Sequence, residues 1–334
     1  MDTYRFDFDP VVLSGTPHPV DGSSVAYAPR RTVLDKVLVD AAAAAGAEVR
    51  ERFTVDEILM EDGTVVGVRG HGDGGGTVTE RARVTIGADG WNSQVARVVD
   101  APRYREKPVL ETAFYTFWSG LSVDAFTSFI RGDKGFAAIP TSDGLTLVLV
   151  GCPFAQASAF RADVEGTYLK TVELVPEFAE DLRGATREER FIGGGVPNFF
   201  RKPFGPGWAL VGDAAYTKDP ITAQGITDAL TGAEGCAAAI DEAFTGARPY
   251  EDAMGAYQAD RDARALPIFE FTTQLATLEP PPPEMQHLLG AMQGNQAAMD
   301  GFASVVAGSL SPGEFFGPDN VATILSAGGT QSAP

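Results

Sequence analysis

The stretch that decides the fold is WALVGDAAYTKDPITAQGITDAL, which runs from Trp208 to Leu230. It opens with four apolar residues, 208–211, that follow a Gly-Pro-Gly turn. A short apolar run bounded by turn residues predicts a strand that is buried on both faces. Gly212 and Asp213 come next, at the carboxyl end of this strand. In open α/β sheets that end of a strand is where ligands bind.

A loop containing Pro220 follows the strand, and we expect a helix to begin near Thr222 to Gln224. Apolar residues recur along this helix at helical spacing, which predicts that their face packs inward. These residues are Ile226, Leu230, Ala233, Ala237, Ile240 and Phe244. The first turn of a helix offers backbone N–H groups and the positive end of the helix dipole, which favour negative charge. The stretch therefore predicts a carboxylate for sugar hydroxyls, one loop before an anion-stabilising helix start.

The segment GDAAYTKDPITAQGITDAL resembles the second flavin-binding motif of the FAD-dependent aromatic hydroxylases, Gly-Asp-Ala-Ala-His followed by Pro and Gly-Gln-Gly. Tyr216 stands where His is usual, and Ala223 stands where the first Gly of that triplet is usual. Both variants are similar to the geranylgeranyl-reductase-like and antibiotic-modifying branch of the family. The resemblance implies a set of FAD contacts: Gly212 and Asp213 at the ribityl chain, Pro220 beside the isoalloxazine, and the amides of Gln224, Gly225 and Ile226 at its pyrimidine end. The alternative is a buried strand, a turn Asp and an ordinary helix.

A second motif, VTIGADGWNS, covers residues 84–93. Its composition predicts a buried strand, a turn and a short helix capped by Asn92 or Ser93. It resembles the family's Gly-Ala-Asp-Gly-x-x-Ser-x-Val-Arg motif, which implies that Asp89 and Gly90 lie near the FAD pyrophosphate. Ala96 replaces the terminal Arg of that motif, so the nicotinamide role of that Arg is not carried over. The alternative is a strand, a turn and a cap without a ligand.

A helix is expected from Arg31 to Gly46, because apolar residues recur there at helical spacing, and a strand is expected to begin at 47–50. The helix resembles the family's Arg-x-x-Leu-Asp helix, in which the arginine lies near the cofactor. Arg31 matches this arginine, and the alternative is a solvated arginine at a helix start.

The remaining pattern predicts two further sheets. Strands are predicted by the alternation of apolar and polar residues at 4–8 and by an extended piece at 25–27. A small antiparallel meander is predicted for 55–60, 65–69 and 77–84, with the glycine run 72–76 as one of its turns. Aromatic and β-branched runs at 110–118, 126–131, 135–139 and 145–150 predict an antiparallel sheet backed by helices near 168–175 and from Pro176. Five aromatics there are candidates for an apolar pocket, although most such residues are core: Phe114, Tyr115, Phe117, Trp118 and Phe136.

We therefore expect the α/β (α+β) class: an N-terminally truncated, Rossmann-like FAD-binding domain with an antiparallel-sheet substrate domain and C-terminal helices. Residues 30–100 and 201–248 form the FAD-binding domain, and 1–29 and 101–200 form the substrate domain. Residues 249–334 form a helical region with a Pro-rich linker at 279–284. Within this region Pro267 ends one helix and starts another, and 285–306 is helical. The last residues are expected to be mobile.

Composition excludes several classes of function. With 44% apolar and 21% charged residues the 334-residue chain is typical of globular proteins, and its net charge of −19 argues against nucleic acid as a partner. Two cysteines and three scattered histidines predict no metal site. No apolar stretch approaches the roughly 20 residues of a membrane span. The start, MDTYRFDFDP, is not a signal peptide, so we expect a cytoplasmic protein of unspecified oligomeric state.

The glycine-rich turn that binds the FAD pyrophosphate in this family, Gly-x-Gly-x-x-Gly, does not occur before Arg31. We therefore expect that the chain is a fragment or the product of a wrongly started reading frame. The upstream DNA should then encode on the order of 60–80 further residues with that turn. The alternative is a relative that has lost tight FAD binding. We also expect the chain as given to bind FAD weakly and to expose apolar sheet edges.

The resemblance implies an FAD-dependent oxidoreductase. We expect a monooxygenase that uses NAD(P)H and O2 on an apolar or aromatic small molecule, with no side chain that stands out as an essential acid or base. Two alternatives stay open. One is a flavin-dependent reductase of an isoprenoid-like double bond, and the other is a non-catalytic relative that binds an apolar ligand.

Overall fold

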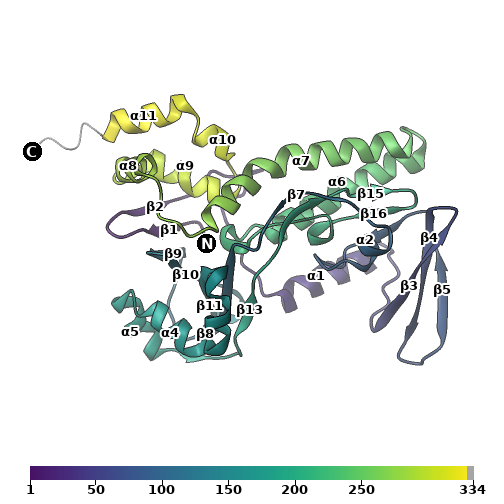
Figure 1. Ribbon diagram of the computed structural model, residues 1–334, viewed down its shortest axis with the longest axis horizontal. Helices are drawn as coiled ribbons and strands as arrows, with labels where there is room; N and C mark the ends of the chain where they lie inside the picture. Colours follow the sequence, from purple (N-terminus) through teal and green to yellow (C-terminus); the bar gives the residue numbers. More distant parts are fainter. Residues whose placement is uncertain (329–334) are drawn as a thin grey trace, which may run out of the picture. The chain divides into compact units, whose positions relative to one another are not determined.

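The computed structural model describes residues 1–328. The chain folds into two compact units (Figure 1). Unit 1 comprises Met1–Leu34, Val109–Val196 and the chain from Pro267, and unit 2 comprises Asp35–Pro108 and Pro197–Leu266. Two helices contribute residues to both units: α1 (Arg31–Ala44) and α7 (Tyr250–Leu275). The units are defined by packing alone, so the functional domains expected from the sequence stay predictions.

Unit 1 is built on an eight-stranded sheet with the order β12-β8-β11-β10-β9-β1-β2, in which β13 also pairs with β8. The strands are β1 (Tyr4–Asp7), β2 (Val12–Gly15), β8 (Glu111–Ser119), β9 (Phe126–Arg131), β10 (Lys134–Pro140), β11 (Thr146–Pro153), β12 (Thr186–Arg187) and β13 (Ile192–Gly194). Its helices are α3 (Ala157–Ala162), α4 (Val164–Val172), α5 (Pro176–Gly184), α8 (Pro283–Met292), α9 (Gln296–Ala307), α10 (Pro312–Phe315) and α11 (Pro318–Gly328).

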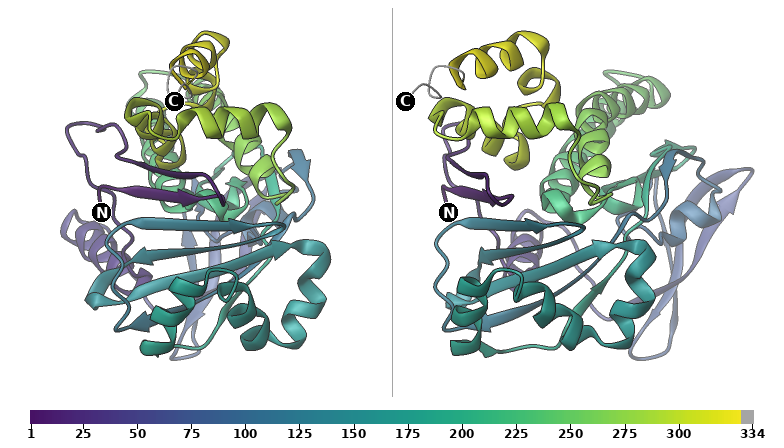
Figure 2. Two further views of the ribbon diagram at one scale, coloured as in Figure 1. Left: turned by 90° about the vertical axis from the view of Figure 1, so that its left-hand side faces the viewer. Right: turned by 60° about the vertical axis from the view of Figure 1, so that its left-hand side comes forward.

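Alternating side chains of this sheet form a core with residues of α3, α4 and α5. Figure 2 shows the backbone of these helices, in teal, beside the strands of the sheet. Phe114, Trp118 and Phe136 belong to this core, as expected for most of the five candidate aromatics. Tyr115 and Phe117 alternate with them along β8, so they lie on the opposite face, where both are half-buried. A second core joins β1 and β2 to α8 and α9.

Unit 2 contains three small sheets, with the orders β3-β4-β5, β15-β16-β6 and β17-β14-β7. The strands are β3 (Phe53–Glu61), β4 (Thr64–Gly72), β5 (Thr77–Arg81), β6 (Thr85–Gly87), β7 (Arg103–Lys107), β14 (Asn198–Arg201), β15 (Phe204–Gly205), β16 (Trp208–Leu210) and β17 (Tyr216–Thr217). The helices that lie wholly in this unit are α2 (Gln94–Val98) and α6 (Gly225–Thr245). The meander, its glycine-rich turn and the strand at 208–211 are confirmed.

Strand β16 is buried on both faces, as its apolar sequence predicts. Trp208 and Leu210 pack in one core with residues of β3, β4 and α2. Ala209 packs in another core with residues of α6 and α7. Two tyrosines of α7 bond the carbonyl groups of β16: the Tyr250 hydroxyl donates to Trp208 O at 2.9 Å, and the Tyr257 hydroxyl donates to Leu210 O at 3.3 Å.

Several predicted strands and helix ends are wrong. Residues 47–50 and 25–27 form no strand, whereas β2 at 12–15 was not expected. The four runs predicted to form an antiparallel sheet do pair antiparallel, and β1 extends this sheet by pairing with β9 in parallel. Pro267 lies inside α7, since the loss of one N–H does not end a helix whose neighbouring turns still bond.

The C-terminal region and one apolar strand also differ from expectation. The helix expected at 285–306 is two helices, separated around Gly294, whose φ of +83° favours glycine. After residue 306 the chain forms two further helices, α10 and α11, and the expectation of mobile last residues falls partly on 329–334, outside the described residues. Ile86 of β6 is 48% exposed, so β6 is not the buried strand that the sequence predicts. The helix predicted from Arg31 is confirmed as α1, and none of its side chains is buried.

Candidate functional site

The carboxyl ends of two parallel strands bring the two sequence motifs together in unit 2. Strands β6 and β16 pair with Gly87 opposite Leu210, and the Val211 N–H donates to the Gly87 carbonyl at 3.0 Å. Asp89 follows β6 by two residues, and Gly212 follows β16 by two residues. Both motifs therefore leave the sheet at the same edge, where the end of a parallel strand is suited to hold a ligand.

Gly212 opens a 3-10 turn, Gly212–Ala214, with a φ of +55° that glycine adopts without strain. A Cβ at this position would lie 3.4 Å from the Cβ of Ala229, so the turn packs closely against α6. Asp213, the second residue of the turn, is exposed. The turn thus holds a solvent-facing carboxylate next to the start of a long helix.

The first turn of α6 presents its backbone to the same region. Gln224 is the N-cap residue, but its side chain makes no capping hydrogen bond. The first N–H groups of a helix have no acceptor within the helix. Gly225 and Ile226 are exposed, and a Cβ added to Gly225 would meet no atom within 4 Å. These amides are therefore open to an acceptor from outside the helix.

The loop between the turn and α6 contains a second 3-10 turn, Pro220–Thr222, in which Pro220 is exposed. Asp219 caps it, because its Oδ1 accepts from the Ile221 N–H at 3.1 Å. Ala223 then adopts a left-handed conformation with φ +54° and ψ +28°. That conformation favours glycine, and it strains an alanine.

Asp89 has its partners in the helix that follows it, α2. One carboxylate oxygen of Asp89 accepts from the N–H groups of Gln94 and Val95, at 2.7 and 3.3 Å. Ser93 caps the same helix, α2, by accepting from the Ala96 N–H at 3.0 Å, as the sequence predicts. Gly90 has a φ of +76°, and a Cβ there would meet nothing within 4 Å. Asp89 therefore fixes α2, while Gly90 leaves its backbone open.

Arg31 is the first residue of α1 and is exposed. It belongs to unit 1, whereas the other eight candidate residues belong to unit 2. Its predicted place near the cofactor stays a prediction.

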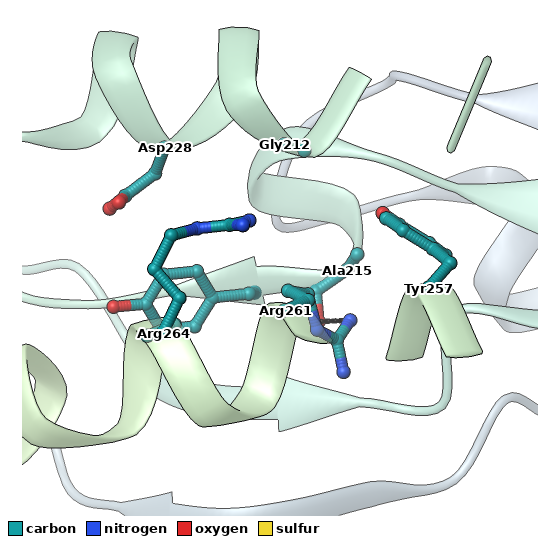
Figure 3. A pocket seen from close by; sticks show the side chains of 9 residues that line it. Gly212, Ala215, Asp228, Tyr257, Arg261 and Arg264 are labelled. Carbon is teal, nitrogen blue, oxygen red and sulfur yellow. Dashed lines mark hydrogen bonds between the residues drawn. The ribbon is translucent and has the colours of Figure 1, made fainter. Parts of the chain in front are cut away.

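A small pocket lies beneath the Gly212 turn, between that turn, α6 and α7 of unit 2 (Figure 3). Figure 3 shows Asp228 entering it from α6 and Arg264 entering it from α7. Tyr216 also lines it, and burial raises the pKa of the Tyr216 hydroxyl, so this residue stays neutral. It is thus unsuited to exchange protons near neutral pH.

Two buried arginines support the Gly212 turn from below, and the sequence did not reveal them. Arg201 donates to the Ala214 carbonyl at 2.6 Å. Arg261 donates to the Ala215 carbonyl at 3.4 Å and to the Tyr104 hydroxyl at 2.6 Å. Both arginines lie outside the motif in sequence, 13 and 46 residues from the carbonyl groups that they bond, so no local pattern predicts these contacts.

The residues of this edge fit a flavin dinucleotide chemically. A carboxylate accepts hydrogen bonds from sugar hydroxyls, and backbone N–H groups at a helix start donate to carbonyl oxygens or to an anion. The glycines 90 and 225 leave open space where side chains would stand. Among residues 1–328, no group of three or more His, Cys, Asp and Glu side chains could hold a metal ion. None of the helices in this described part combines the length and apolar composition that a membrane span requires.

A family model described as "FAD binding domain" matches residues 18–272. Digeranylgeranylglycerophospholipid reductase of Methanosarcina acetivorans is 30% identical over 219 residues, which are 63% of this chain and 52% of that protein. The chain therefore spans about half the length of the curated relatives it matches.

Solved flavoproteins share the fold. A flavoprotein/dehydrogenase from Cytophaga hutchinsonii superposes with a TM-score of 0.79 at 17% identity, covering 99% of this chain and 83% of that one. The myxobacterial chondrochloren halogenase, an FAD-dependent halogenase, superposes with a TM-score of 0.75 at 21% identity, covering 100% and 82%. At these identities the likeness concerns the fold.

Proposed function

The chain belongs to the family of FAD binding domains, and from this premise we propose that it is part of an FAD-dependent oxidoreductase acting on an apolar or aromatic small molecule. The observation that carries the proposal is the pairing of exposed Asp213 with the open first turn of α6 at one sheet edge. Such an edge supplies both a carboxylate for hydroxyl groups and N–H groups for an anion.

The roles of the residues follow from their chemistry. Asp213 accepts hydrogen bonds from the ribityl hydroxyls, and Gly212 allows the close turn that presents it. Pro220 shapes the loop beside the ring, while the amides of Gln224, Gly225 and Ile226 donate to the pyrimidine end and favour negative charge there. When bound, FAD supplies electron transfer to and from the substrate.

Three further candidate residues have more distant roles in this proposal. Asp89 and Gly90 lie at the same edge and approach the pyrophosphate, with Asp89 acting through α2, whose N-terminus it fixes. Arg31 contributes a positive charge near the cofactor. The three are weaker assignments by chemistry, since none combines an exposed carboxylate with an open helix start.

The substrate is proposed to lie against the face of the unit 1 sheet that carries Tyr115 and Phe117. Both side chains are half-buried, and the Arg30 guanidinium lies 4.8 Å from the centre of the Phe117 ring. Leu147 and Leu149 flank them on the paired strand β11. A half-exposed apolar face with aromatic rings favours an apolar or aromatic ligand.

The reaction that we propose is monooxygenation with NAD(P)H and O2. A second candidate, reduction of an isoprenoid-like double bond, is favoured by the identity with the Methanosarcina acetivorans reductase. The test is to titrate purified protein with FAD, record its visible spectrum, and follow NADH and NADPH oxidation with and without a panel of aromatic and isoprenoid compounds. Substrate-stimulated oxygen uptake supports monooxygenation, and anaerobic substrate turnover with a reduced flavin supports reduction. A chain that neither binds FAD nor responds to any compound contradicts both.

A further inference from the structure

Lys218 is a buried cation within the loop that links the Gly212 turn to α6. Its side chain is 4% exposed, and its ammonium forms an ion pair with the Asp228 carboxylate, whose side chain is 25% exposed. The ammonium also lies 5.0 Å from the centre of the Tyr216 ring. Removing one partner of a buried ion pair leaves an uncompensated charge, which is strongly unfavourable. The ion pair therefore constrains the backbone at Lys218 and at Asp228.

The two residues of this pair belong to the two elements of the proposed flavin site, the loop that contains Pro220 and the first turn of α6. Lys218 precedes Pro220 by two residues, and Asp228 lies in the first turn of α6, two residues after Ile226. Other bonds hold the two ends of the loop. Thr217 pairs with Phe199, the Asp219 N–H donates to Asn198 Oδ1 at 2.7 Å, and the Gln224 carbonyl accepts from the Asp228 N–H at 3.0 Å. Lys218 adds a side-chain contact from the loop to α6.

We propose that Lys218 is a positioning residue that clamps loop 217–224 onto the first turn of α6 and fixes Pro220 relative to the amides of Gln224 to Ile226. The consequence for the flavin rests on the proposed function. Because the pair is neutral as a whole, each partner alone would place one uncompensated charge beside the region where negative charge develops. Charge variants of the two partners should therefore act in opposite directions on a bound flavin.

The first test uses the protein without flavin. Amide hydrogen exchange is compared for wild type, Lys218→Met, Asp228→Asn and the control Lys36→Met, which removes an exposed ion pair with Asp40 on α1. Lys218→Met and Asp228→Asn should each speed exchange of the amides from 218 to 227 by at least about tenfold, because local opening becomes easier. Lys36→Met should leave these amides unchanged. Unchanged exchange in both clamp variants overturns the proposal.

Global loss of structure is separated from local opening by the same data, since it would speed exchange throughout both units. If Lys218→Met fails to fold, Asp228→Asn and Lys218→Arg carry the test, and Lys218→Arg should keep the slow exchange because it keeps the charge.

The second test uses FAD-loaded protein and measures the flavin midpoint potential. Lys218→Met should lower the potential, Asp228→Asn should raise it, and the double variant should return toward wild type. Shifts of the same sign in both single variants contradict an electrostatic contribution and leave only a structural one. If wild-type protein takes up no flavin, the proposed function fails, and the exchange experiment still decides whether the clamp exists.

Discussion

At the scale of single residues, Asp89 and Asp213 show how similar sequence contexts lead to different chemistry. Each lies a short way beyond a strand that ends at the same sheet edge. The Asp89 carboxylate accepts two backbone N–H groups of α2 and so is committed to a helix start. Asp213 is exposed beside the open first turn of α6. The two exposed carboxylates therefore lie beside different helix starts, Asp89 at α2 and Asp213 near α6.

This difference leads to a paired prediction. Asp213→Ala should weaken FAD binding by about 1.5–3 kcal/mol, the range for a hydrogen bond to a charged group. Asp89→Ala should instead lower the free energy of unfolding by about 1 kcal/mol through loss of a cap. Fluorescence titration with FAD and urea unfolding measure the two quantities. Equal FAD affinity in wild type and Asp213→Ala would remove Asp213 from the site.

Local features of these residues were predictable from the sequence, and long-range partners were not. Ser93 as a cap depends only on residues three positions away. Lys218, Arg201 and Arg261 acquire their roles from groups that the fold brings to them, 10 to 60 residues distant in sequence. A charged residue in a sequence pattern is ordinarily solvated, so nothing local marks it as a buried support.

At the scale of elements, α6 buries few of the large residues that its spacing predicts to face inward, although Ile240 is partly buried against the core. Ile226, Leu230 and Phe244 are 40%, 47% and 40% exposed. The buried residues are Gly232, Cys236 and Ala239, which are small. Cys236 and Ala239 share a core with Ala209 of β16, where small side chains let helix and strand approach closely. Periodicity identified the helix, but residue size misled the choice of its face.

The start of α6 gives a prediction with a matched control. Gly225→Pro removes one exposed N–H, so the flavin midpoint potential should fall, because a helix start stabilises negative charge by about 0.3–1 kcal/mol or more when partly buried. Gly225→Ala keeps the N–H and has open space for its Cβ, so it should keep the wild-type potential and stabilise the helix by about 0.5–1 kcal/mol. Proline also disfavours the helical backbone of Gln224, whose ψ is 0°, so circular dichroism must first show intact folding.

A Gly225→Pro protein that is folded and has an unchanged or raised potential would contradict the assignment of these amides to the flavin. A lowered potential in Gly225→Ala would show that added bulk, rather than the lost N–H, is responsible.

At the scale of the whole molecule, the two units carry separate cores, and the acidic net charge of −19 is spread over a chain without a nucleic-acid signature. Within unit 2, β6 is an edge strand of its small sheet, and its Ile86 is 48% exposed. The fold class was predictable because strands and helices follow local periodicity. The division of the chain into units was less predictable, because α7 continues through Pro267 and contributes residues to both units.

Stability should fall in alkaline solution, since several acidic groups are buried in their neutral form. Burial raises the pKa of the Cys236 thiol from its ordinary 9.0 to about 11 and raises the pKa of the Tyr104 hydroxyl from 10.0 to about 12. A pKa raised on folding gives stability that is complete below the unfolded pKa and is lost as the pH rises through the folded pKa.

For Cys236 this window lies between 9.0 and about 11, and its full effect is at most about 3 kcal/mol, at about 1.4 kcal/mol per pKa unit. Urea midpoints measured from about pH 8 to about pH 11 should therefore decline, and the decline should be shallower in Cys236→Ala, which removes one titrating group. A midpoint that stays constant to about pH 11 would show that these groups ionise without opening the cores, and that water reaches them in the folded chain.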